Sequence, residues 1–124
     1  MNEPRLLLRA HAQRLADAGE LEAAADAWRV LADLEEERGS SDAVVFRTYA
    51  KRALIAAWAT PRFPDRTIRY THVSVIRRGR GGNAWSSDFE PYEFKVYAVG
   101  EGQPVACVVI DRRDRIRERR CRDR

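Results

Sequence analysis

The chain is poor in the residue types that build metal and catalytic sites. Its 124 residues include two histidines, His11 and His72, and two cysteines, with no close His/Cys spacing that would suggest a zinc site. No apolar run approaches the roughly 20 residues that span a bilayer. The N-terminus carries acidic Glu3 where a secretory signal would begin with basic residues. These features predict a soluble, cytoplasmic, single-domain protein without a metal or cofactor.

The two cysteines lie in very different surroundings. Cys107 belongs to the apolar run 105–110, whereas Cys121 lies among arginines. A free cysteine in a protein core behaves as a small hydrophobic residue. We therefore expect no disulfide, and we expect Cys107 to be a buried free thiol.

Positive charge is concentrated in the second half of the chain. Residues 1–60 carry 8 basic and 10 acidic side chains, whereas residues 61–124 carry 15 basic and 9 acidic ones. Arginine supplies nearly all of the positive charge, which a GC-rich genome could explain, but such a genome would not explain the segregation. A basic half indicates a partner rich in phosphate or carboxylate groups.

The first 60 residues have the apolar spacing of three helices. Pro4 suits a first helical turn, and Gly19 ends the first helix. The second helix begins at Leu21 and ends in the acidic run before Gly39. Polar residues at 40–42 can then cap a third helix that extends to about Ala59.

From residue 67 onward, β-branched and aromatic residues alternate with polar ones. One strand is expected over 67–77 and a hairpin over 92–111, and the tail is expected to be helical or frayed. We predict an α+β fold in which three N-terminal helices pack on one face of a small, mainly antiparallel, three-stranded sheet. The predicted parts are a single domain (1–111), made of a helical half (1–60) and a β half (67–111), and an arginine-rich tail (112–124).

A motif in the helical half resembles two known types of helical hairpin. Small Ala24 lets two helices approach closely, and Trp28 fills the space beside it; the full motif is Leu15, Gly19, Leu21, Ala24 and Trp28. The pattern resembles a single tetratricopeptide-type hairpin. Over residues 12–57 at most, it also resembles the PerC-like regulators of enterobacteria and their phages, in which such a hairpin precedes a basic helix. This resemblance implies a transcriptional role for the matching residues Arg47, Tyr49, Lys51 and Arg52.

A helix-turn-helix is a second DNA-binding interpretation. The second and third helices would form it across the turn 38–41, with the later hairpin as a wing. Against this interpretation, the third helix is apolar on most faces after Ala53, so that its second half must be buried. The residues that would face DNA are Arg47, Thr48, Lys51 and Arg52.

Two arginine-rich segments are the most pointed features of the basic half. In the loop after residue 76, glycines allow close approach of a ligand, arginines can neutralise phosphates and Trp85 can stack on a base. The alternative is a flexible turn with solvated charges. In the last fourteen residues, eight arginines exceed four acidic residues, although helical spacing would let several pair with each other. The candidate contact residues are Arg77, Arg78, Arg80, Trp85, Arg112, Arg113, Arg115 and Arg119.

An enzymatic interpretation has less support. The hairpin followed by Arg112 and Arg113 resembles the terminal hairpin of RelE/ParE-type toxins, in which basic residues on a sheet face RNA or an antitoxin. This resemblance implies a ribonuclease, with His72 as a general base. That family opens with a strand, whereas this chain opens with a helix, and no spacing links His72 to another catalytic candidate.

We therefore expect a non-catalytic accessory or regulatory protein that contacts nucleic acid through its arginine-rich loop and tail. The alternative is a protein-binding inhibitor or adaptor that acts on a nucleoprotein complex, such as an anti-CRISPR or another anti-defence protein of a phage or mobile element. The acidic run Glu35, Glu36 and Glu37 favours this alternative, because carboxylates can mimic nucleic acid.

Overall fold

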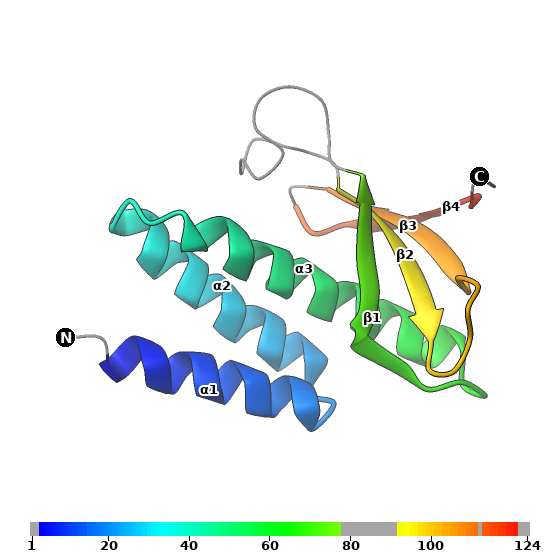
Figure 1. Cartoon of the computed structure of the whole chain (residues 1–124), viewed down its shortest axis with the longest axis horizontal. Coiled ribbons are helices and arrows are strands. Elements are labelled where there is room, and N and C mark those ends of the chain that lie inside the picture. The colour runs from blue at the N-terminus through cyan, green and yellow to red at the C-terminus, as the bar shows by residue number, and fades with distance from the viewer. Residues whose placement is uncertain (1–2, 78–91, 112, 122–124) are drawn as a thin grey trace. The chain divides into compact units, whose positions relative to one another are not determined.

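The computed structural model describes the backbone of residues 3–77, 92–111 and 113–121, and every side chain there except those of residues 3, 69–72, 74–77 and 92. Three helices come first and an antiparallel sheet follows, so that the predicted α+β class is confirmed (Figure 1). The chain divides into two compact units, Met1–Leu54 and Ile55–Arg124. The boundary lies within the third helix, whereas the sequence pattern changes at residues 60–66.

We call the first unit, Met1–Leu54, the helical unit. Its first hairpin is formed by helices α1 (Glu3–Asp17) and α2 (Leu21–Glu37). Gly19 between them has a φ of 82°, a left-handed conformation that glycine adopts without steric cost. The backbone N–H of Glu20 donates to the carbonyl of Leu15 at 2.8 Å, the bond pattern of a Schellman motif. The predicted helix end at Gly19 is therefore confirmed.

Helix α3 (Asp42–Ala59) follows a second turn of the same kind, in which Gly39 has a φ of 72°. Trp28 on α2 is 1% exposed. Its ring stacks on Phe46 at 5.7 Å between centroids and meets the edge of Tyr49 at 4.9 Å. Trp28 thus fills a core position, as its place in the motif predicts.

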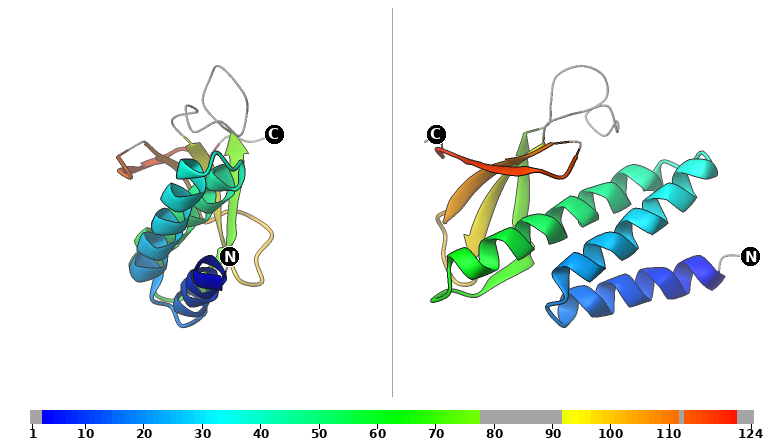
Figure 2. Two further views of the ribbon diagram at one scale, coloured as in Figure 1. Left: turned by 90° about the vertical axis from the view of Figure 1, so that its left-hand side faces the viewer. Right: turned by 180° about the vertical axis from the view of Figure 1, so that it is seen from behind.

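The second unit contains the end of α3, the short 3-10 helix Thr60–Arg62 and a four-stranded sheet. All neighbouring strands are antiparallel, and the order β1-β2-β3-β4 makes β1 and β4 the two edges (Figure 2). The strands are β1 (Ile68–Arg77), β2 (Tyr92–Ala98), β3 (Ala106–Ile110) and β4 (Ile116–Arg119).

The register separates a buried face of the sheet from an outer face. Phe94 lies opposite Val108, and both are fully buried. Lys95 lies opposite Cys107, which lies opposite Arg119. Because directly opposed residues point to the same face and neighbours along a strand to opposite faces, Lys95 and Arg119 lie on the outer face.

The segment that we expected to be a helical or frayed tail contains strand β4, and that prediction was wrong. A tight turn reverses the chain: the N–H of Asp111 donates to the carbonyl of Arg115 at 3.1 Å, and Asp114 has a φ of 62°. Half-buried Ile116 then lies opposite Ile110 on β3. The charged residues around Ile116 conceal this strand in the sequence, and the sheet has four strands instead of three.

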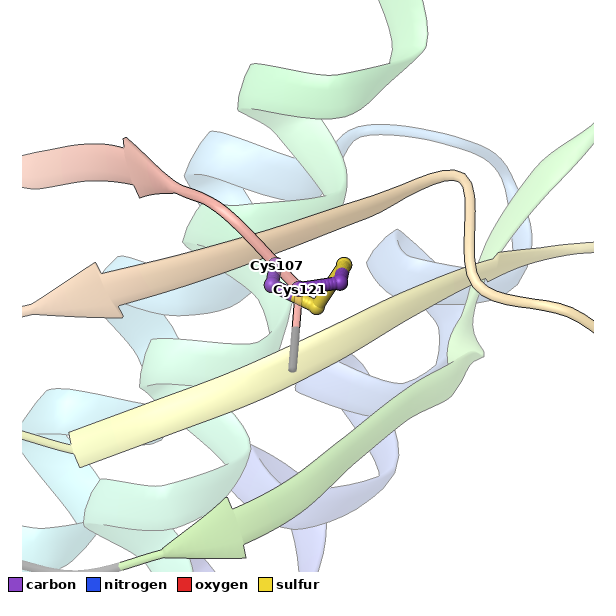
Figure 3. The surroundings of a disulfide bond; sticks show 2 residues. All are labelled: Cys107 and Cys121. Carbon is purple, nitrogen blue, oxygen red and sulfur yellow. A yellow bond between two sulfur atoms is a disulfide. The ribbon is translucent and has the colours of Figure 1, made fainter. Parts of the chain in front are cut away.

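The two cysteines form a disulfide, which corrects the expectation of a free thiol (Figure 3). Cys107 is buried as predicted, at 3% exposed. Strand β4 returns the chain alongside β3, which brings the Cα atoms of Cys107 and Cys121 to 5.2 Å. The different sequence surroundings of the two cysteines carry no information about this distance.

Candidate nucleic-acid interface

Five arginines lie in the β3–β4 turn and along β4, and Asp111 organises their turn. One oxygen of its carboxylate, Oδ1, accepts hydrogen bonds from the backbone N–H groups of Arg113 at 2.8 Å and Arg115 at 3.0 Å. The other oxygen, Oδ2, accepts one from Nε of Arg115 at 3.0 Å. We name this group the basic hairpin, and its members are Arg113, Arg115, Arg117, Arg119 and Arg120.

Hydrogen bonding also fixes the charge state of Asp111. The N–H of Arg115 lowers the pKa of this carboxyl most, and the N–H of Arg113 and the guanidinium of Arg115 lower it further, against a smaller opposing effect of desolvation. The pKa therefore lies below its ordinary value of 3.8. Asp111 is a carboxylate at neutral pH, and the turn keeps its hydrogen bonds.

The members of the basic hairpin differ in whether they have an acidic partner. Arg115 is paired with Asp111, and Arg119 is paired with Glu93 on β2. The other three, Arg113, Arg117 and Arg120, are exposed, and the described part of the chain offers their guanidinium groups no ion pair. Three guanidinium groups on one ordered hairpin can therefore bind an external anion.

The outer face of the sheet extends this positive surface. Arg117 lies opposite Val109, which lies opposite Glu93, so that Arg117 shares the outer face with Lys95 and Arg119. Glu93 is already engaged by Arg119. The positive charge of Arg117 and Lys95 is thus left for a partner of opposite charge.

The predicted loop contacts lie mostly outside the described residues. For Arg77 the structure describes the backbone alone, at the end of β1 opposite Glu93. The residues Arg78, Arg80, Trp85 and Arg112 lie outside the described residues altogether.

Helix α3 does not present the basic surface that the sequence suggested. Arg47 is hydrogen-bonded to Asp33 at 3.1 Å and to Glu36, both on α2. Partial burial lowers the pKa of Arg47, but these bonds raise it by more, so that its net shift is upward. Lys51 is 8% exposed. Arg47 and Lys51 therefore belong to the fold of the helical unit.

Thr48 and Arg52, which were also predicted to face DNA, are buried and half-buried. Thr48 is 4% exposed, and its hydroxyl donates to the carbonyl of Val44 at 3.0 Å. Arg52 is half-buried, and its buried Nε has no hydrogen-bond partner in the described part of the chain. Tyr49, which the PerC-like pattern places on the same basic helix, packs against Trp28. These contacts do not favour a DNA-reading role for α3.

The acidic run at the end of α2 is largely engaged in ion pairs. Glu35 is 6% exposed and pairs with Arg5 at 3.1 Å and Arg38 at 3.5 Å. Glu36 pairs with Arg47, and Glu37 is exposed. The three carboxylates therefore do not form one free acidic face, as mimicry of nucleic acid would require.

A cavity of about 300 Å³ lies in the helical unit, between the starts of α1 and α3 and the end of α2. Its polar wall is formed by Glu35 with Arg5 and Arg38, and Arg9 lies over the Phe46 ring at 5.8 Å. Across the described ranges, no group of three His, Cys, Asp or Glu side chains is placed to hold a metal ion. The side chain of His72 is outside the described residues.

Comparisons of the chain with protein-family models, curated proteins and solved structures find no match. Among the described helices, none has the length and apolar character needed to cross a membrane. The chemistry of the basic hairpin and the outer face is therefore the basis for a functional proposal.

Proposed function

We propose that this protein is a non-catalytic accessory or regulatory protein that contacts the phosphate backbone of nucleic acid through the basic hairpin. The observation that carries the proposal is the presence of three exposed guanidinium groups, Arg113, Arg117 and Arg120, without acidic partners in the described part of the chain. Arginine binds phosphate oxygens through two donors at once. The sequence adds Arg77, Arg78, Arg80, Trp85 and Arg112 to the proposed surface.

The test is fluorescence anisotropy with labelled single- and double-stranded DNA and RNA at about 50 mM and about 200 mM salt. Each phosphate contact releases counterions, so we expect affinity to fall steeply with salt. The double variant Arg113→Gln/Arg117→Gln should make the negative slope of log K against log salt shallower by about 2. Absence of binding at the lower salt concentration would refute the proposal.

A matched control separates a local contact from the effect of net charge. Arg9 and Arg14 on α1 are exposed, and the described residues include no ion pair of either. The variant Arg9→Gln/Arg14→Gln changes the net charge by the same amount as the hairpin variant. It should weaken binding much less, whereas equal losses would show that the hairpin is not the contact surface.

A protein target is the second candidate, in which the chain is an inhibitor or adaptor of a nucleoprotein complex of the anti-defence type. One observation favours it: the helical unit exposes several large apolar side chains, and such side chains mark a protein contact where they form a contiguous patch. The exposed apolar side chains are Leu6, Leu7, Val30, Leu34 and Val45. If a protein is the target, a pull-down from the native host after nuclease treatment should return a stoichiometric partner.

We propose the cytoplasm as the site of action, because nucleic acid and nucleoprotein complexes are found there. The Cys107–Cys121 disulfide makes this placement testable, since disulfides are rare in reducing compartments. Maleimide labelling of the protein in intact cells, followed by a mass shift on a gel, measures its thiol state. A fully oxidised protein would contradict a permanently reducing surrounding.

A further inference from the structure

The disulfide joins the core of the sheet to the end of its edge strand. Cys107 is on β3, with strands on both sides, and is 3% exposed. Half-buried Cys121 follows β4 by two residues (Figure 3). The segment between the two cysteines contains Asp111, the turn and the basic hairpin. It is therefore held to the sheet at both ends, at its start by the backbone of β3 and at its end by the disulfide.

Without this bond, β4 has few other attachments in the described structure. It is four residues long and pairs with β3 alone. Ile116 is only half-buried, and the side-chain tie that reaches beyond β3 is the pair of Arg119 with Glu93. Short edge strands with little apolar burial are among the first parts of a protein to open.

We propose that the Cys107–Cys121 disulfide is a redox-sensitive clamp that holds β4 and the basic hairpin on the sheet. The oxidised form presents the arginines in one fixed arrangement, and the reduced form releases the basic hairpin as a basic arm. The link to nucleic acid rests on the proposed function. The clamp itself rests on the position of the two cysteines.

The chemistry is thiol–disulfide exchange with a dithiol reductant. Its first thiolate attacks Sγ of Cys121, which is the less buried of the two residues, and forms a mixed disulfide while Sγ of Cys107 leaves as a thiolate. The second thiolate of the reductant then attacks the reductant's first sulfur in the mixed disulfide, and Cys121 leaves as a thiolate. Two electrons and two protons pass to the protein, and the dithiol becomes a disulfide.

The exposure of the arginines changes little on reduction, but their arrangement changes. A fixed array of guanidinium groups binds a phosphate backbone without first losing conformational entropy. A released arm must lose that entropy when it binds. We therefore expect the oxidised form to bind nucleic acid about threefold more tightly or better at the same salt concentration.

The first experiment tests the clamp without nucleic acid. Hydrogen exchange is measured by mass spectrometry on the oxidised protein and on the protein reduced with dithiothreitol, whose thiol state is checked by maleimide labelling. Amides of Ile116–Arg119 should lose about tenfold or more protection on reduction, while those of β2 keep theirs. Cys121→Ser should match the reduced protein and should not respond to dithiothreitol. Unchanged protection of β4, or equal loss across the whole sheet, would overturn the clamp.

The second experiment compares the nucleic-acid affinity of the oxidised and reduced proteins by anisotropy. Tighter binding by the oxidised protein supports control of the basic hairpin by the disulfide. Equal affinities combined with an opened β4 would overturn that control. If neither form binds, the proposed function fails, and the exchange result alone decides whether the clamp exists.

Discussion

Arg119 on β4 reaches across β3 to Glu93 on β2, where its Nη1 donates a hydrogen bond to the carboxylate at 2.5 Å. The side chain of Glu93 is 15% exposed and that of Arg119 is 33% exposed. The pair therefore ties an edge strand to a strand that is not its neighbour. The ion pair and the disulfide both connect the β4 segment to the rest of the sheet on its outer face.

This ion pair should contribute measurably to stability. We expect a double-mutant cycle with Arg119→Gln and Glu93→Gln to give a coupling free energy of about 1 kcal/mol, since the charge-assisted bond is partly screened by solvent at Arg119. Urea unfolding of the two single variants, the double variant and the wild type measures it. A coupling energy near zero would mean that the two charges are solvated independently.

Asp111 should give the β3–β4 turn a dependence on acid. Its folded pKa is lowered, chiefly by the N–H of Arg115, so its contribution to stability is present above the ordinary pKa of 3.8 and is lost as pH falls through the folded pKa. An NMR titration of the Asp111 carboxyl carbon should give a midpoint below 3.8. Asp111→Ala should remove this acid dependence of the turn. A midpoint at or above the ordinary value would contradict the hydrogen-bonded turn.

Glu35 should be the most sensitive carboxylate of the helical unit. Its side chain is 8% exposed and lies between Arg5 and Arg38. We expect Glu35→Gln to lower the free energy of unfolding by about 1–2 kcal/mol, because both arginines can still reach water when the charge is lost. Exposed Glu37→Gln is the matched control and should change it by less than about 0.5 kcal/mol. Equal effects of the two changes would show that burial of Glu35 is unimportant.

The helices were predictable because local signals decide them. Gly19 and Gly39 both have a positive φ that glycine accepts easily, and both end a helix where the sequence places them. Trp28 was predictable as a core residue from its helical spacing. The ion pairs between the helices were not predictable, because Arg47 pairs with acidic residues eleven and fourteen positions away in the chain.

The basic half was less predictable because distant pairing decides it. Of the three exposed arginines without an acidic partner in the described part of the chain, Arg113 was among the predicted contact residues, whereas Arg117 and Arg120 were not. Their strand was not predicted either, since a single apolar residue, Ile116, marks it. The disulfide depends on the return of β4 beside β3, and the pair of Arg119 with Glu93 depends on the order of three strands. Asp111 and Asp114 are typical turn residues, and they are the signal from which the hairpin, and with it the approach of the two cysteines, could have been predicted.

Trp28 should be the residue on which the helical unit depends most. It is 1% exposed and contacts both Phe46 and Tyr49. We expect Trp28→Ala to cost about 3–5 kcal/mol, because it leaves a large cavity between the helices. Trp28→Phe should cost much less, about 1–2 kcal/mol, because a ring is kept and the buried Nε1 has no partner in the described part of the chain to lose.

Trp58 is the internal control for this prediction. It is half-buried, and its ring is covered on one side by the guanidinium of Arg62 at 4.3 Å. Truncation there removes a partly solvated contact, so Trp58→Ala should cost less than Trp28→Ala in urea unfolding followed by circular dichroism. If the two truncations cost the same, the aromatic cluster around Trp28 is not the centre of the helical core. If Trp28→Phe is as damaging as Trp28→Ala, the helical unit needs the full volume of the indole ring and not merely an aromatic ring at this position.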